Sequence, residues 1–323
     1  MKPPAIKTSY SVKSAIVGGS LWVAFVVWRV TDFRTLAWST ALLGFAALVL
    51  IPLVLDLVLP VDEASGGPKI FRAVRGLQFP AALLLLLSCS TPSGGWAAAV
   101  AAPWIVLTAM LAVAGLRRSL QRGLPPLWSL CHDAGLVFIA VGGAWTLADR
   151  LGLHPLGFGT DIVQLTAVHF HFAGLILPVV TGLVLREFPA SRIADTAGWG
   201  VLAGVPLVAV GITSSQLGQT HAVEFFAALV LAGSAMIVAL FQLRLATQTR
   251  RALGVRVCWA VAGFSLLAGM SLALLYSARP YFSPVPWLDL PWMRALHGTA
   301  NALGFAFCAL LGWRLNEPKP TPS

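Results

Sequence analysis

The chain alternates long apolar stretches with short polar segments. A helix needs about 20 mainly apolar residues to cross the hydrocarbon core of a bilayer. Ten stretches satisfy this requirement. They cover residues 14–30, 36–59, 71–90, 96–116, 126–148, 161–185, 197–215, 221–243, 256–278 and 290–313. The pattern predicts an all-α fold, a polytopic transmembrane helix bundle of about ten spans.

Composition supports this fold class and excludes a soluble domain. Of the 323 residues, 58% are apolar and only 11% are charged, whereas a soluble domain carries about 25% charged residues. The segments between the apolar stretches are too short to form a separate soluble domain. We therefore interpret residues 1–323 as a single integral membrane domain.

The positions of the charges predict a topology. The chain has 22 Lys and Arg against 12 Asp and Glu, a formal net charge of +10, which in a soluble protein would suggest nucleic acid as a partner. Here 17 of the basic residues fall on one side of the predicted spans and five on the other. Because Lys and Arg are retained in cytoplasmic loops, both termini are predicted to be cytoplasmic. The expected partners are membrane lipids and a small or lipophilic substrate, with no nucleic acid.

The first span is expected to be retained in the mature protein. Lys2, Lys7 and Lys13 precede it in the way that basic residues begin a signal peptide, but no small-residue cleavage site follows.

The sixth predicted span carries two histidines near the middle of the membrane. His169 and His171 lie roughly 12 to 15 Å below the outer boundary, counted from Asp161 at a helical rise of about 1.5 Å per residue. Residues two apart on a helix point about 200° away from each other, so the two rings cannot share one ion. Each must have its own partner, either a ligand, metal or haem, or a polar group on a neighbouring helix.

The tenth span adds a polar stripe. Arg294, His297 and Asn301 share one helix face, and His297 is expected at the same depth as His169. Glu224, at the outer start of the eighth span beside His221, could overhang the same region. Ionisable groups at membrane depth are costly and usually mark a site. The candidate catalytic residues are His169, His171, His297, Asn301, Glu224 and Arg294, and the candidate cofactor or metal ligands are His169, His171 and His297.

A second polar group lies at the cytoplasmic start of the fifth span. His132 and Asp133 are adjacent and therefore point in different directions. We expect each to find another partner, such as Asp56 near the inner end of the second span.

Two motifs resemble a known family. The stretches Val168-His-Phe-His-Phe-Ala-Gly-Leu175 and His297-Gly-Thr-Ala-Asn-Ala-Leu-Gly-Phe305 are similar to those of the YndJ-like bacterial membrane proteins. The likeness covers most of the C-terminal two thirds of the chain. It implies a multi-pass protein of the bacterial cytoplasmic (inner) membrane, in a family whose members are often labelled transporters, and it assigns no catalytic role to these positions.

The His-Phe-His sequence is also similar to the helix of haem-copper oxidases whose two histidines ligate haems on opposite sides. The chain lacks that family's His-Pro-Glu-Val-Tyr segment and the following His-His pair. Oxygen reduction at a haem-copper centre is therefore not expected. Binding of haem or of a transition metal by the three histidines stays open.

These observations leave three functions open. The first is an enzyme or redox protein in which histidine acts as acid and base or as metal ligand, Glu224 orients it, and Asn301 or Arg294 stabilises negative charge. The second is a proton-coupled secondary transporter, favoured by ten spans, mid-span prolines, and similar stretches that begin at His132 and His171. The third is a membrane scaffold or assembly protein whose histidines only bond neighbouring helices.

Overall fold

The described residues form ten helical spans, as the hydrophobic pattern predicts. The computed structural model describes residues 10–59, 69–123 and 125–316, so Lys2 and Lys7 lie outside the described residues. Each of the ten helices is long and apolar enough to cross a membrane. Seven are α-helical throughout: α1 (Tyr10–Arg29), α4 (Lys69–Cys89), α5 (Gly95–Arg122), α6 (Leu127–Leu151), α9 (Arg192–Gln216), α10 (His221–Ala246) and α11 (Leu253–Ser277).

The second, sixth and tenth spans are each interrupted by a π-helical segment, and we call them span two, span six and span ten. Span two consists of α2 (Leu36–Phe45), η1 (Ala46–Leu50) and α3 (Ile51–Val58). Span six consists of α7 (Thr160–His169), η3 (Phe170–Ile176) and α8 (Leu177–Glu187). Span ten consists of α12 (Leu290–Thr299), η4 (Ala300–Phe307) and α13 (Cys308–Asn316). Outside the spans, the described residues include one short 3₁₀ helix, η2 (Pro155–Gly157).

The sequence supplies a local cause for each π segment. Pro52 follows η1 and Pro178 follows η3, each at the start of the next α-helix. Proline has no N–H to donate and its ring collides with the carbonyl four residues earlier, so a wider turn before it relieves the collision. In span ten the side-chain amide of Asn301 donates to the His297 carbonyl at 2.8 Å, and this carbonyl also accepts from the backbone N–H of Ala300. The π segments therefore coincide with residues that perturb the α-helical ladder.

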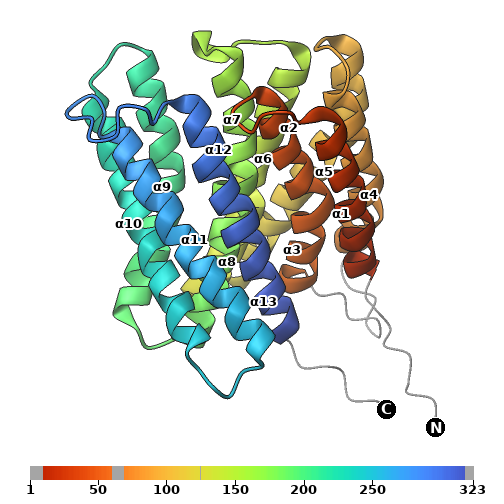
Figure 1. Ribbon diagram of the computed structural model, residues 1–323. Coiled ribbons are helices and arrows are strands. Elements are labelled where there is room, and N and C mark those ends of the chain that lie inside the picture. The colour runs from red at the N-terminus through yellow and green to blue at the C-terminus, as the bar shows by residue number, and fades with distance from the viewer. Residues whose placement is uncertain (1–9, 60–68, 124, 317–323) are drawn as a thin grey trace.

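Spans two and six form the centre of the bundle. Of their most apolar windows, 89% and 83% of the residues are buried, against 22 to 50% in the other eight spans. Span ten packs against both of them and against α11, and η4 contacts both η1 and η3. Figure 1 shows span ten, in blue, between the α9–α11 helices and the red N-terminal helices. The three π segments thus meet in the interior.

The outer faces of the peripheral helices are apolar. Val27, Phe264 and Leu253 are between 65% and 81% exposed. Side chains of this kind are stable in contact with lipid tails rather than water. The exposure pattern therefore agrees with a membrane-embedded bundle.

Helix α1 begins and α13 ends at the same end of the bundle (Figure 1). We call this the inner end, because the Lys and Arg count predicts it to be cytoplasmic, and we call the opposite end the outer end. The orientation itself stays a prediction.

Candidate functional site

His169 and His297 lie on spans six and ten, whose π segments contact each other in the interior of the bundle. His169 is the last residue of α7, directly before η3. His297 lies in α12, close to the start of η4. The two rings are close enough to interact electrostatically. The Nε2 atom of His169 is buried and has no hydrogen-bond partner among the described residues. That the two histidines lie at the same membrane depth stays a prediction.

Hydrogen bonds fix the orientation of the His297 ring. Its Nδ1 lies 2.8 Å from the carbonyl oxygen of Gly269 on α11. Because a carbonyl can only accept, Nδ1 carries the proton and Nε2 is left as the acceptor nitrogen of a neutral ring. Asn301 donates its Nδ2 to the His297 carbonyl, and its Oδ1 is buried without a partner among the described residues.

Gly269 allows this arrangement to form. A Cβ atom at position 269 would lie 2.4 Å from Nδ2 and 2.8 Å from Oδ1 of Asn301. The absence of a side chain therefore lets Asn301 approach the backbone of α11 while His297 bonds the Gly269 carbonyl. We call His169, His297 and Asn301 the central histidine site.

His171 belongs to a different environment. Its Nε2 accepts a hydrogen bond from the Trp104 indole of α5 at 3.0 Å, and its Nδ1 donates to the Ala167 carbonyl at 2.7 Å. The ring stacks on the indole, and a Cβ at Gly142 of α6 would lie 2.9 Å from its Nδ1. Both nitrogens are used within the protein, and the ring is fully buried. His171 thus takes its partners from α5 and from its own helix.

The three histidines do not form one ligand set. In the described part of the chain, no three or more His, Cys, Asp or Glu side chains are arranged to hold a metal ion. His171 could bind a metal only by giving up the bond from Trp104 or the bond to Ala167. Among the described residues the three histidines therefore do not share one ion, and binding of haem or metal by a single histidine stays a prediction.

Arg294 connects three elements at the outer side of the central histidine site. Its guanidinium pairs with Asp161 in the first turn of α7 and donates to the Arg34 carbonyl in the loop before α2. The Arg294 side chain is 3% exposed, whereas that of Asp161 is 50% exposed. Arg294 is thus engaged in an ion pair rather than free to stabilise developing charge on a substrate.

Glu224 lies elsewhere. It lies in the first turn of α10 and is paired with His221 at 3.8 Å, on the outer surface. A Cβ at Gly211 of α9 would meet the Glu224 backbone. Among the described residues, no contact joins Glu224 to His169 or His297, so the sequence-based role of Glu224 in orienting a catalytic histidine gains no structural basis.

Further polar side chains connect span two to spans ten and six. The Trp38 indole donates to the Thr299 hydroxyl at 3.0 Å. Gln164 donates to the Thr40 hydroxyl at 3.0 Å, and its Oε1 is buried without a partner among the described residues. Gln164 is a polar residue inside an apolar span, so its sequence position was a usable signal, but the Thr and Trp partners gave none.

The expected partnership between His132 and Asp56 is not formed. Asp56 pairs with Arg75 at 2.8 Å and with Arg314 at 3.7 Å. Asp133 pairs with Arg118 of α5, and the His132 ring lies edge-on to Trp128. The abundance of Arg at the inner end explains this, because a carboxylate gains more from a guanidinium than from a buried neutral imidazole.

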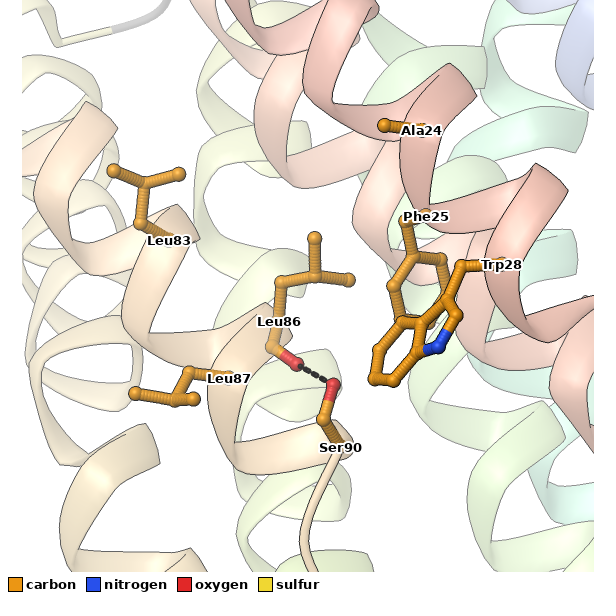
Figure 2. A pocket seen from close by; sticks show the side chains of 7 residues that line it. All are labelled: Ala24, Phe25, Trp28, Leu83, Leu86, Leu87 and Ser90. Atoms are coloured by element: carbon orange, nitrogen blue, oxygen red, sulfur yellow. Dashed lines mark hydrogen bonds between the residues drawn. The ribbon is translucent and has the colours of Figure 1, made fainter.

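The hollows at the surface include two whose linings can be compared with the site. One, of about 710 Å³, lies at the outer end and is lined by Asp32, Phe33, Arg34, Trp292, Ala295, Leu296, Thr299 and Ala300. The other, of about 400 Å³, lies between α1 and α4 and is lined by Ala24, Phe25, Trp28, Leu83, Leu86, Leu87 and Ser90 (Figure 2). The first hollow borders the loop before α2, whose Arg34 carbonyl accepts the bond from Arg294. The second hollow is almost entirely apolar, and none of the candidate residues lines it.

Comparison with known proteins agrees with a membrane protein. Residues 41–305 match the family model described as YndJ-like protein. The chain is 29% identical over 267 residues to the Bacillus subtilis (strain 168) protein named "Uncharacterized membrane protein YndJ", a match that covers 78% of this chain and 46% of the relative. The chain thus spans about half the length of the curated relative it matches. No solved structure matches it.

Proposed function

The chain belongs to the YndJ-like protein family, and on that premise we propose that it is a proton-coupled transporter of a small solute, with His169 and His297 as its protonatable centre. The observation that carries this proposal is the pair of neighbouring imidazoles in the bundle interior, one with a buried nitrogen that no described group satisfies. Histidine is the side chain whose ordinary pKa lies nearest physiological pH, which suits it to reversible proton binding.

The location of the pair supports transport. Ionisable groups that face the interior of a membrane bundle are expensive and commonly mark a solute or proton pathway. Arg294 closes the outer side of the site through Asp161, and that aspartate is half exposed. A solute arriving from the outer end would therefore meet an ion pair that can separate.

The three π segments supply a means of movement. Spans two, six and ten all contain one, and η4 contacts both η1 and η3. π-Helical turns inside α-helices are frequent at functional sites, because they leave the backbone ladder locally weaker. Helices that meet at such turns can change their relative register at lower cost than regular helices, as alternating access requires.

The enzyme hypothesis has less support from the geometry. It assigned charge stabilisation to Asn301 or Arg294 and orientation of a histidine to Glu224. Arg294 is paired with Asp161 and Glu224 lies at the surface beside His221, so only Asn301 keeps its assigned role. The groups that remain together are two imidazoles and an amide. This set can bind a solute and exchange a proton.

Proton movement into liposomes tests the proposal. Purified protein is reconstituted in vesicles loaded with the pH-sensitive dye pyranine, and methylammonium, acetate, phosphate and glycerol are added separately outside. We expect at least one solute to drive a pH change that empty vesicles do not show. His169→Gln and His297→Asn should lower its rate at least tenfold. His297→Asn keeps an N–H that can donate to the Gly269 carbonyl, which limits structural damage.

His221→Gln is the matched control, because His221 is exposed and distant from the central histidine site. It should retain the wild-type rate. Equal proton movement in wild-type and His169→Gln/His297→Asn vesicles with every solute would contradict the proposal.

A further inference from the structure

We propose that the solute carried at the central histidine site is a small primary amine in its ammonium form, exchanged for a proton. This inference rests on the proposed function and names its substrate class. It comes from the hydrogen-bonding capacity that His169, His297 and Asn301 retain after their contacts within the protein are counted.

Most of the retained capacity consists of acceptors. His297 donates through Nδ1 to Gly269, which leaves Nε2 with a lone pair. Asn301 donates one of its two Nδ2 hydrogens to the His297 carbonyl, which leaves one N–H and Oδ1, an atom that can only accept. His169 Nε2 has no partner among the described residues and accepts when its ring is protonated on Nδ1.

An ammonium group matches these acceptors in number. A primary ammonium group has three N–H donors on one nitrogen and no lone pair. A carboxylate or phosphate presents only acceptors and would oppose the Asn301 oxygen. Buried acceptors without a donor cost free energy, so the ligand that satisfies them gains the most from binding.

The charges around the site do not oppose a cation. The positive charge of Arg294 is matched by Asp161. Helix α2 has no titratable side chain. On α6 and α11 the titratable groups lie toward the span ends. They are Cys131, His132, Asp133, Asp149 and Arg150 on α6, and Arg256, Cys258 and Tyr276 on α11. Of these, Asp133 pairs with Arg118 and Asp149 with Arg150. The immediate surroundings are therefore neutral.

This neutrality makes proton and amine compete. A protonated His169 or His297 and an ammonium group would be two like charges in an interior of low dielectric constant, where their repulsion is strong. Binding of one therefore excludes the other. Mutual exclusion at a single site, opened alternately to the two sides, exchanges one proton for one amine cation.

Binding and uptake of methylammonium test the inference. We expect methylammonium to raise the melting temperature of the detergent-purified protein and radiolabelled methylammonium to enter proteoliposomes in exchange for protons. Tetramethylammonium, a cation without N–H donors, should do neither, and acetate should have no effect. Lowering the pH should weaken methylammonium binding, because protonated histidine competes with it.

Two substitutions at one position separate recognition from folding. Asn301→Leu and Asn301→Asp both lose the bond to the His297 carbonyl, but only Asp keeps an acceptor oxygen and adds a negative charge. We expect Asn301→Leu to weaken methylammonium binding at least tenfold and Asn301→Asp to preserve or strengthen it. His221→Gln again serves as the control.

The outcomes distinguish the two proposals. Proton movement driven by acetate, phosphate or glycerol but not by methylammonium overturns the amine assignment and retains proton-coupled transport. Equal responses to methylammonium and tetramethylammonium, or equal losses in Asn301→Leu and Asn301→Asp, also overturn the assignment. Methylammonium binding without any proton movement contradicts the transport function itself.

Discussion

The Trp104 indole of α5 donates a hydrogen bond to Nε2 of His171 at 3.0 Å, and the two rings stack with an angle of 16° between their planes. This bond fixes His171 as the neutral tautomer with its proton on Nδ1, where it donates to Ala167. The second histidine of the His-Phe-His motif therefore connects span six to α5. Only the first lies in the central histidine site.

Trp104→Phe should lower stability without abolishing transport. The substitution leaves the buried Nε2 of His171 without a donor, at a cost of about 1 to 3 kcal/mol. Thermal unfolding in detergent measures the loss, and the proteoliposome assay measures the remaining activity. Trp96→Phe is the matched control, since Trp96 is 74% exposed and should have little effect. An unchanged melting temperature for Trp104→Phe would show that the bond contributes nothing.

Gly182→Ala should destabilise the interface between span six and α6. A Cβ at position 182 would lie 2.5 Å from Cδ2 of His132 and 2.5 Å from the Trp128 carbonyl, so the helices must separate. Overpacking of this kind costs about 1 to 3 kcal/mol.

Gly233→Ala is the control for this substitution, because a Cβ there meets nothing within 4 Å. Alanine is intrinsically better than glycine inside a helix by about 1 kcal/mol, so this change should be neutral or stabilising. Thermal unfolding measures the melting temperature of both variants. Equal shifts for Gly182→Ala and Gly233→Ala would contradict overpacking at position 182.

The hydrophobic pattern was sufficient to predict the ten spans, because span length is set by the thickness of the bilayer and by nothing specific to this protein. Spacing was sufficient to separate His169 from His171. The proximity of His169 and His297 depends on equal depth in two adjacent spans. The depth was predictable, but the adjacency depends on packing between segments more than 100 positions apart.

The partners could not be predicted for the same reason. In the sequence, Trp104 resembles any other apolar residue of its span. Asp56 pairs with Arg75 and Arg314 because the fold brings their helices together. The π segments are a partial exception. Pro52 and Pro178 predict an irregular helix from the sequence alone. In span ten the side chain of Asn301 bonds the His297 carbonyl next to the π segment, and the residue type does not indicate this bond.

Breaking the Arg294–Asp161 pair should have unequal effects depending on which partner is removed. Asp161→Asn leaves the guanidinium of Arg294, only 3% exposed, without a counter-ion, and a buried unpaired charge costs up to about 3 kcal/mol. Arg294→Gln leaves Asp161 half exposed, so water solvates the carboxylate and the loss of stability should be smaller. Thermal unfolding of the two variants and of the double variant measures the asymmetry. A larger loss for Arg294→Gln would mean that its bond to the Arg34 carbonyl, rather than the ion pair, dominates.

The predicted orientation can be tested with two glycine positions at opposite ends of the bundle. Gly254 lies at the start of α11 at the inner end and Gly159 directly before α7 at the outer end. Both are exposed, and a Cβ at either meets nothing within 4 Å, so cysteine should fit at each without disturbing the fold.

Because the inner end carries most of the Lys and Arg, it is expected to stay in the cytoplasm. A membrane-impermeant thiol reagent applied to intact cells should therefore modify Gly159→Cys and reach Gly254→Cys only after the membrane is permeabilised. The unsubstituted protein controls for the four native cysteines, which are buried or half-buried. The reverse labelling pattern would place both ends of the described chain outside the cell. The half-exposed Asp161 would then face the cytoplasm.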